Sequence, residues 1–232
     1  MLVLPRSSDF GESMAWRIVR GAVENVAPAS QERLFLTFPM KKDPALLRAA
    51  WDCALEAIGE RLHRGLDVAF ATEGDPSLYS TFGYLQRRSP EAWPGIEIEV
   101  VPGVSSLAAV PAVTGIPLAD GQERIAIIPG NYGVGELETL LQTFDTVVLM
   151  KIGSEMPAVV EAIGRAGLLD RAVYVSKATM PEQRVLRDLS GAHGASGDCF
   201  SMIVVARKER AGVLVGDAPA GQSLGLGAGV SG

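Results

Sequence analysis

The chain has 232 residues, of which 47% are apolar and 21% charged, and its formal net charge at pH 7 is −6. This balance excludes an intrinsically disordered chain, and the negative charge argues against a nucleic-acid partner, which would need a basic surface. No signal peptide and no apolar run of about 18 residues occurs, so we expect a cytoplasmic protein without a membrane partner.

The first half of the chain alternates strand and helix signals. Short apolar runs predict strands at 2–4, 34–38 and 68–71, and the alternation of apolar and acidic residues predicts one at 96–101 with one solvated face. Apolar residues at helical spacing predict helices at 11–23, 44–64 and 78–88, and another after residue 105. Ser8 or Asp9 is expected to cap the first helix and Asp43 the second, while Pro111 is expected to kink or end the last of them.

The pattern restarts after a linker at 117–121. Apolar runs predict strands at 125–128, 147–150, 173–176 and 200–205, and helical spacing predicts helices at 135–144 and 156–166. Such alternation indicates α/β layers. We expect two α/β domains, residues 1–117 and 122–210, and a disordered tail over 211–232, which is rich in Gly, Ala and Ser.

The two cysteines, Cys53 and Cys199, lack both a CxxC partner and a nearby histidine. We therefore expect both to be reduced core residues, with no disulfide and no metal site. Neither His63 nor His193 is assigned a chemical role, and no general base can be identified. The glycine-rich segment 130–135 lacks the GxGxxG spacing of a dinucleotide-binding loop.

Two turns of the same kind, each leading from a strand to a helix, stand out in the first half. One is Glu73-Gly-Asp-Pro76 and the other is Pro102-Gly-Val-Ser-Ser106. Such turns lie at the carboxyl ends of strands, where open α/β sheets bind ligands. Gly74 permits a positive φ or a close backbone approach, and Asp75 can accept hydrogen bonds from amides or hydroxyls. For either turn alone, an ordinary strand-to-helix connection is the simpler interpretation.

Taken together, Glu73-Gly-Asp-Pro-Ser-Leu-Tyr-Ser-Thr-Phe82, Val101-Pro-Gly-Val-Ser-Ser106 and Gly115-Ile-Pro117 resemble the tetrapyrrole methylase family. The resemblance implies two α/β domains with a cleft between them, S-adenosyl-L-methionine as cofactor, a tetrapyrrole substrate and a homodimer. The form GDPSLYSTF is most similar to members that methylate precorrin-2 at C20 to give precorrin-3A in cobalamin biosynthesis. Cobalt-precorrin-2 or another ring position is the alternative specificity.

The resemblance also implies site residues. Those that match the family's cofactor contacts are Glu73, Gly74, Asp75, Ser105, Ser106, Met150 and Ala178. The residues expected to face the substrate are Arg6, Asp9, Tyr79 and Lys151. A substrate with many carboxylates needs cationic partners, and Arg17, Arg87 and Arg88 are further candidates, although a solvated surface charge is the simpler interpretation of each.

One departure from the family concerns the start of the chain. The family normally opens with a strand, a GxGPGD loop and a helix before the strand that occurs here at 2–4, so the first domain is expected to be truncated. A non-catalytic binding remnant is therefore the rival interpretation from another class. A generic nucleotide-binding protein is disfavoured because neither a Walker A sequence nor a dinucleotide fingerprint occurs.

Overall fold

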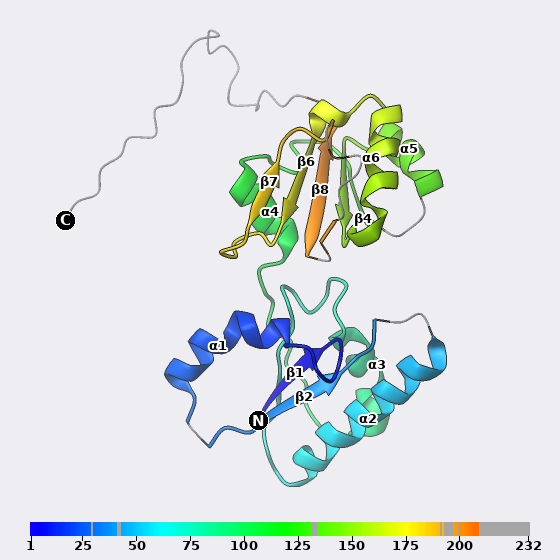
Figure 1. The fold of residues 1–232 in the computed structure, drawn as a ribbon. Helices are drawn as coiled ribbons and strands as arrows, with labels where there is room; N and C mark the ends of the chain where they lie inside the picture. The colour runs from blue at the N-terminus through cyan, green and yellow to red at the C-terminus, as the bar shows by residue number, and fades with distance from the viewer. Residues whose placement is uncertain are drawn as a thin grey trace, which may run out of the picture. The chain divides into compact units, whose positions relative to one another are not determined.

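The computed structural model describes residues 1–28, 30–40, 43–130, 134–190, 192, 197–198 and 200–208. The chain divides into two compact units, Met1–Ser105 (unit 1) and the residues from Ser106 onward (unit 2), each with its own sheet (Figure 1). Cys199, His193, residues 131–133 and the tail at 211–232 lie outside the described residues. The domain limits inferred from the sequence stay a prediction.

Unit 1 is built on a parallel sheet of three strands in the order β2-β1-β3. The strands are β1 (Leu2–Arg6), β2 (Arg33–Thr37) and β3 (Ala69–Phe70). The helices are α1 (Met14–Val26), α2 (Pro44–His63) and α3 (Phe82–Ala92). These positions agree with the sequence prediction to within a few residues, apart from a later start of α1 and α3.

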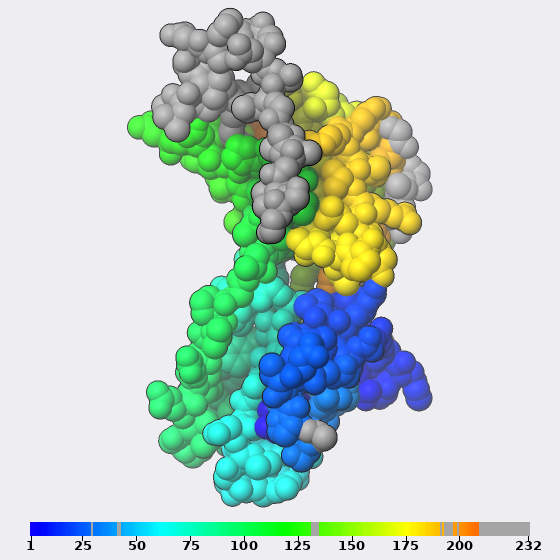
Figure 2. Space-filling view, turned by 90° about the vertical axis from the view of Figure 1, so that its left-hand side faces the viewer, coloured from blue at the N-terminus to red at the C-terminus, as the bar shows by residue number. Residues whose placement is uncertain are grey.

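Helices cover both faces of this sheet because successive side chains of β1 point to opposite faces. Val3 is fully buried in a cluster that includes Leu55 of α2 and Leu85 of α3. Leu4, on the other face, is fully buried against α1, of which only Ala15 is itself buried. The rest of α1 contributes to the surface of unit 1, where it appears in blue in Figure 2.

The structure differs from the sequence prediction at the N-cap of α1 and at Pro111 in α4 (Ser106–Thr114). Ser13, and neither Ser8 nor Asp9, is the N-cap of α1: its hydroxyl oxygen accepts a 3.2 Å hydrogen bond from the N–H of Trp16. Asp9 is instead engaged by Arg6 and Thr37. α4 continues past Pro111, so this proline does not end the helix, and the kink expected there stays a prediction.

The strand expected at 96–101 does not form. The alternation in this segment indicated one buried face, yet Val100 and Val101 are 41% and 70% exposed. A strand persists only where a neighbouring backbone takes its hydrogen bonds, and no described strand pairs with this segment. Cys53 also departs from expectation, since it is exposed on α2 instead of buried in the core.

Unit 2 has a mixed sheet of five strands in the order β4-β5-β8-β6-β7. The strands are β4 (Ile125–Pro129), β5 (Thr146–Met150), β6 (Ala172–Ser176), β7 (Arg184–Leu186) and β8 (Ser201–Ala206). Besides α4, the helices are α5 (Val134–Thr143) and α6 (Met156–Arg165), with short 3-10 turns at Gly153–Glu155 and Leu169–Arg171. The short β7 was not predicted.

The core of unit 2 lies between the sheet and the helices α5 and α6. Alternate residues of the central strands, such as Leu149 and Ile203, pack against Leu141 of α5 and Ile163 of α6, and all four are at most 1% exposed. Every residue of β5 and β6 is buried, and so is every residue of β8 except the last, Ala206. Among the described residues, no helix is both long and apolar enough to span a membrane.

Candidate functional site

The first glycine turn follows β3 directly and is organised by Asp75. Oδ1 of Asp75 accepts hydrogen bonds from the N–H of Ser77, at 2.8 Å, and from the Ser77 hydroxyl. Oδ2 accepts a 2.9 Å hydrogen bond from the N–H of Gly103, which belongs to the second turn. One carboxylate therefore closes its own turn and ties it to the other.

Glycine is required at the contact between these two turns. A Cβ atom on Gly103 would lie 2.3 Å from the carbonyl oxygen of Gly74, far inside van der Waals contact. Gly74 has φ +71°, and a Cβ there would lie 3.4 Å from Cα of Ser105. The positive φ and close approach anticipated for Gly74 are both present, and the two turns pack backbone against backbone.

Hydrogen bonds lower the pKa of Asp75 below its ordinary value of 3.8. The largest cause is the Ser77 hydroxyl, followed by the N–H groups of Gly103 and Ser77, all of which stabilise the ionised carboxylate. Asp75 is therefore an ionised acceptor at neutral pH. Because its described hydrogen bonds hold the two turns together, we assign it to positioning and not to proton transfer.

The structure brings the predicted cofactor residues Gly74 and Asp75 against the second turn, next to Ser105. Glu73 and Gly74 are exposed, and Ser105 and Ser106, the last residue of unit 1 and the first of unit 2, are half-buried. Tyr79, three residues after the first glycine turn, is 43% exposed and has φ +50°, which is uncommon for a residue other than glycine. The result is an exposed surface of backbone, hydroxyl and aromatic groups at the end of β3.

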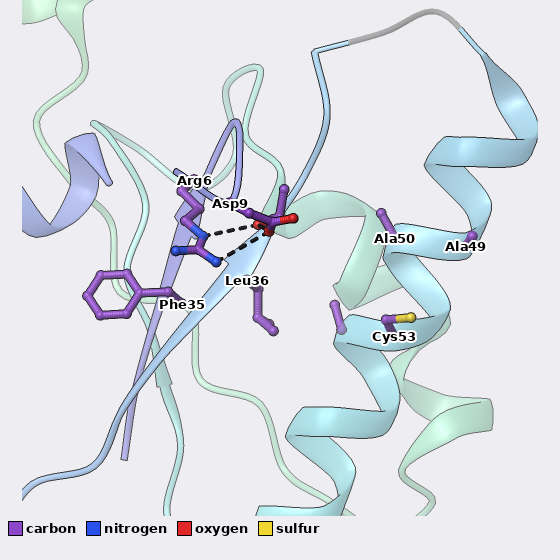
Figure 3. Close-up of a pocket in the computed structure, with 9 residues that line it drawn as sticks. Arg6, Asp9, Phe35, Leu36, Ala49, Ala50 and Cys53 are labelled. Carbon is purple, nitrogen blue, oxygen red and sulfur yellow. Dashed lines mark hydrogen bonds and ion pairs between the residues drawn. The ribbon is translucent and has the colours of Figure 1, made fainter. Parts of the chain in front are cut away.

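Arg6 and Asp9 meet at the carboxyl ends of β1 and β2. Nη2 of Arg6 lies 3.3 Å from Oδ1 of Asp9, and Nε of Arg6 donates a 3.0 Å hydrogen bond to Oγ1 of Thr37, which itself donates to Asp9. This network borders a cavity of about 310 Å³ whose opposite side is formed by small residues of α2, including Ala50 and Cys53 (Figure 3). Thr37 was not among the predicted substrate residues.

The predicted residues of unit 2 follow two strand ends. Buried Met150 is the last residue of β5 and exposed Lys151 follows it, while half-buried Ala178 lies two residues after β6. β8 separates β5 from β6 in the sheet. The structure therefore places Lys151 and Ala178 at the same edge of the sheet, two strand positions apart.

The remaining candidates do not join these groups. Arg88 forms an ion pair with Asp52 at 2.5 Å on the surface of unit 1, and its neighbour Arg87 is exposed. Arg17 lies half-buried on α1 and has interactions of its own. Within the described part of the chain, no group of three or more His, Cys, Asp or Glu side chains is arranged to hold a metal ion.

Comparison with known proteins decides the family. The family described as "Tetrapyrrole (Corrin/Porphyrin) Methylases" matches residues 15–192. The chain is also 34% identical over 191 residues to the cobalt-precorrin-2 C(20)-methyltransferase of Salmonella typhimurium, covering 82% of this chain and 77% of that protein. The chain belongs to the tetrapyrrole methylase family.

One further relative supports the membership, and one solved structure supports the fold. The precorrin-2 C(20)-methyltransferase of a Sinorhizobium species is 30% identical over 155 residues, covering 67% of this tetrapyrrole methylase and 62% of that protein. The uroporphyrin-III C-methyltransferase of Thermus thermophilus, solved in complex with S-adenosyl homocysteine, has a TM-score of 0.57 at 19% identity and covers 88% of this chain and 84% of that one. The resemblance and the α/β fold inferred from the sequence are thereby confirmed.

Proposed function

We propose that this tetrapyrrole methylase transfers a methyl group from S-adenosyl-L-methionine to C20 of precorrin-2, forming precorrin-3A in cobalamin biosynthesis. The observation that carries the proposal is the identity of 34% and 30% to two enzymes named for methylation at C20. One of them is named for the cobalt-containing substrate and the other for the metal-free one. Cobalt-precorrin-2 is accordingly the second candidate substrate.

The residues of the two turns, with Met150 and Ala178 of unit 2, offer the kinds of group that the proposed cofactor needs. A nucleoside joined to an amino acid needs backbone amides and carbonyls, hydroxyls and apolar contacts, and the exposed Gly74 backbone, the hydroxyls of Ser105 and Ser106 and the buried Met150 offer these groups. When bound, S-adenosyl-L-methionine supplies an electrophilic methyl group on sulfur. Glu73, Asp75 and the backbone of Ala178 complete the proposed set.

The chain's contribution to methyl transfer is then chiefly positioning. Displacement at a methyl carbon requires the acceptor carbon and the sulfur to be held in line and kept from water, and it needs neither a nucleophilic side chain nor a protein-bound metal. The hydrogen bond between Asp75 and Gly103 fixes the two turns that would hold the methyl donor. Arg6, Asp9, Tyr79 and Lys151 are proposed to contact the substrate.

Calorimetric titration with S-adenosylhomocysteine followed by product analysis tests this function. We expect micromolar binding, and the addition of one methyl group to precorrin-2 by mass spectrometry, with NMR placing it at C20. Parallel reactions with cobalt-precorrin-2 decide between the two substrates. Binding without methylation of either substrate would instead identify a non-catalytic binding protein. We also infer a cytoplasmic homodimer, which light scattering tests through the mass in solution.

A further inference from the structure

Three cationic residues lie along one edge of the unit 2 sheet. β5 and β6 are both antiparallel to β8, which separates them, so their carboxyl ends lie at the same edge, where Lys151 and Lys177 directly follow them. β7 begins at this edge too, because its first residue, Arg184, pairs with Ser176, the last residue of β6. With neighbouring strands about 4.8 Å apart, the backbones of the three cations span about 14 Å. Figure 1 shows β8, β6 and β7 side by side.

The backbone holds the two lysines in matching positions. Lys151 has φ +56° and Lys177 has φ +49°. The N–H of Lys151 donates a 3.0 Å hydrogen bond to the carbonyl of Ser201, and that of Lys177 donates a 2.8 Å hydrogen bond to the carbonyl of Phe200. Left-handed backbone is unfavourable for such residues and persists where surrounding contacts hold it, often at binding sites. The beginning of β8 thus fixes a lysine on each side of it.

The cationic groups at this edge differ in their contacts. Nζ of Lys177 lies 3.3 Å from Oδ2 of Asp198, and both side chains are about 30% exposed. Arg184 is exposed, and its guanidinium makes no hydrogen bond or ion pair with another described residue. Two further acids lie close in sequence to these cations: Glu182, two residues before Arg184, and Glu155, four residues after Lys151. Arg184 can therefore bind a ligand carboxylate without giving up a described ion pair.

We propose that Lys177 and Arg184 extend the predicted contact of Lys151 into a cationic row (Lys151, Lys177 and Arg184) that binds carboxylate side chains of the substrate. This inference rests on the proposed function, in which the substrate is a tetrapyrrole bearing acetate and propionate groups. Arg184 can hold a carboxylate through two parallel N–H donors, and the ammonium of Lys177 can share its three donors between Asp198 and a substrate carboxylate.

Single substitutions with a charge-matched control test the row. Lys177→Gln and Arg184→Gln each remove one positive charge at this edge. Arg171→Gln removes one at the opposite edge, since Arg171 directly precedes β6. The probe is uroporphyrin, a stable tetrapyrrole with eight carboxylates, whose binding is followed by fluorescence. We expect each row variant to bind it about fivefold to tenfold more weakly, and Arg171→Gln to bind it as the unchanged protein does.

Asp198→Asn separates binding from a structural role of Lys177. It removes the charge facing Lys177 but keeps an Oδ1 that can accept the 2.9 Å hydrogen bond from the N–H of Phe200. If Lys177 binds the substrate, this variant binds uroporphyrin at least as tightly as the unchanged protein. If Lys177 only supports the fold through its ion pair, Asp198→Asn reproduces the loss seen with Lys177→Gln, and the proposal is overturned.

The KM for precorrin-2 distinguishes failure of this inference from failure of the proposed function. In the row variants we expect a higher KM at unchanged kcat, with unchanged binding of S-adenosylhomocysteine. If the row variants have a normal KM and bind uroporphyrin normally, the proposal that the cationic row binds substrate is overturned and the proposed function is not. The same holds if the unchanged protein does not bind uroporphyrin. An unchanged protein that binds S-adenosylhomocysteine but methylates neither precorrin-2 nor its cobalt form overturns the proposed function.

Discussion

The carboxylate of Asp75 and the N–H of Gly103 are 28 residues apart in the sequence and are joined by a 2.9 Å hydrogen bond. This bond joins the two glycine turns, which are far apart in the sequence, into one structural element. Ser77 occupies the other carboxylate oxygen, so both oxygens of Asp75 serve the same arrangement. The geometry of the proposed cofactor site therefore depends on the hydrogen bonds that Asp75 makes within unit 1.

Asp75→Asn tests that dependence. An asparagine side chain has one acceptor oxygen instead of two, so it must give up either the Ser77 hydrogen bonds or the one from Gly103. We expect the affinity for S-adenosylhomocysteine, measured by calorimetry, to fall about tenfold. Asp188→Asn is the control, because Asp188 likewise accepts a 2.9 Å hydrogen bond from the N–H of Ser190 but bonds to no second turn among the described residues. Equal losses in the two variants would contradict the assignment.

Gly103→Ala tests the contact between the turns directly. The added Cβ would lie 2.3 Å from the carbonyl oxygen of Gly74, so the two turns must separate. We expect the loss of measurable S-adenosylhomocysteine binding while circular dichroism shows a folded protein. Gly83→Ala is the matched control, since a Cβ at that position in α3 meets no atom within 4 Å. Retention of full affinity in Gly103→Ala would mean that the turns are not packed as described.

The ion cluster around Asp145 predicts a pH dependence of stability. The N–H of Arg124 is the largest cause that lowers the pKa of Asp145 below 3.8, and the charges of Lys208 and Arg207 add to it. At pH values near 3.8, the folded protein therefore binds fewer protons than the unfolded chain. The stabilisation from Asp145 is complete above about pH 5 and is lost as the pH falls through the lowered pKa of the folded state.

Urea unfolding of the unchanged protein and of Asp145→Asn measures this effect. We expect the variant to be less stable at pH 6, and the difference in the free energy of unfolding to shrink steadily below about pH 4. A difference that stayed constant from pH 6 to pH 3 would show that the ionised form of Asp145 is not what stabilises the fold.

The packing of α6 on the unit 2 sheet gives a stability prediction. Ile163 is fully buried among residues of α5, α6 and the sheet. Ile163→Ala should lower the free energy of unfolding of unit 2 by about 2–5 kcal/mol, because it removes buried methyl groups and leaves a cavity. Ile163→Val should cost only about 0.5–1.5 kcal/mol. Chemical denaturation compares the two, and similar losses would argue against tight packing at this position.

Local signals allowed much of the fold to be predicted from the sequence. Asp43 and Pro44 open α2 as expected, since an N-cap acceptor and a proline at the first helical position act within one turn. Ser13 caps α1 in place of Ser8 or Asp9 because Asp9 is taken by Arg6 and Thr37, the latter 28 residues away. That competition is a tertiary effect that no local pattern contains.

The same distinction applies to the site. The glycines and Asp75 could be found because turns leave a residue pattern, whereas the hydrogen bond between Asp75 and Gly103 depends on how two distant turns meet. Lys177 and Arg184 were missed because the order of the strands, and not their spacing in the sequence, places them beside Lys151. The segment 96–101 was wrongly predicted as a strand because alternation reports side-chain polarity and says nothing about a pairing partner.

The position of β8 in the sheet affects how unit 2 folds during its synthesis. β8 is the last described strand of the chain, yet it occupies the middle of the five-stranded sheet and pairs with both β5 and β6. Before residue 206 leaves the ribosome, β4 and β5 have no hydrogen-bonded connection to β6 and β7. Unit 2 can therefore complete its sheet only after β8 has been synthesised, and a chain that ends before β8 has two half-sheets whose unpaired edges are prone to aggregation.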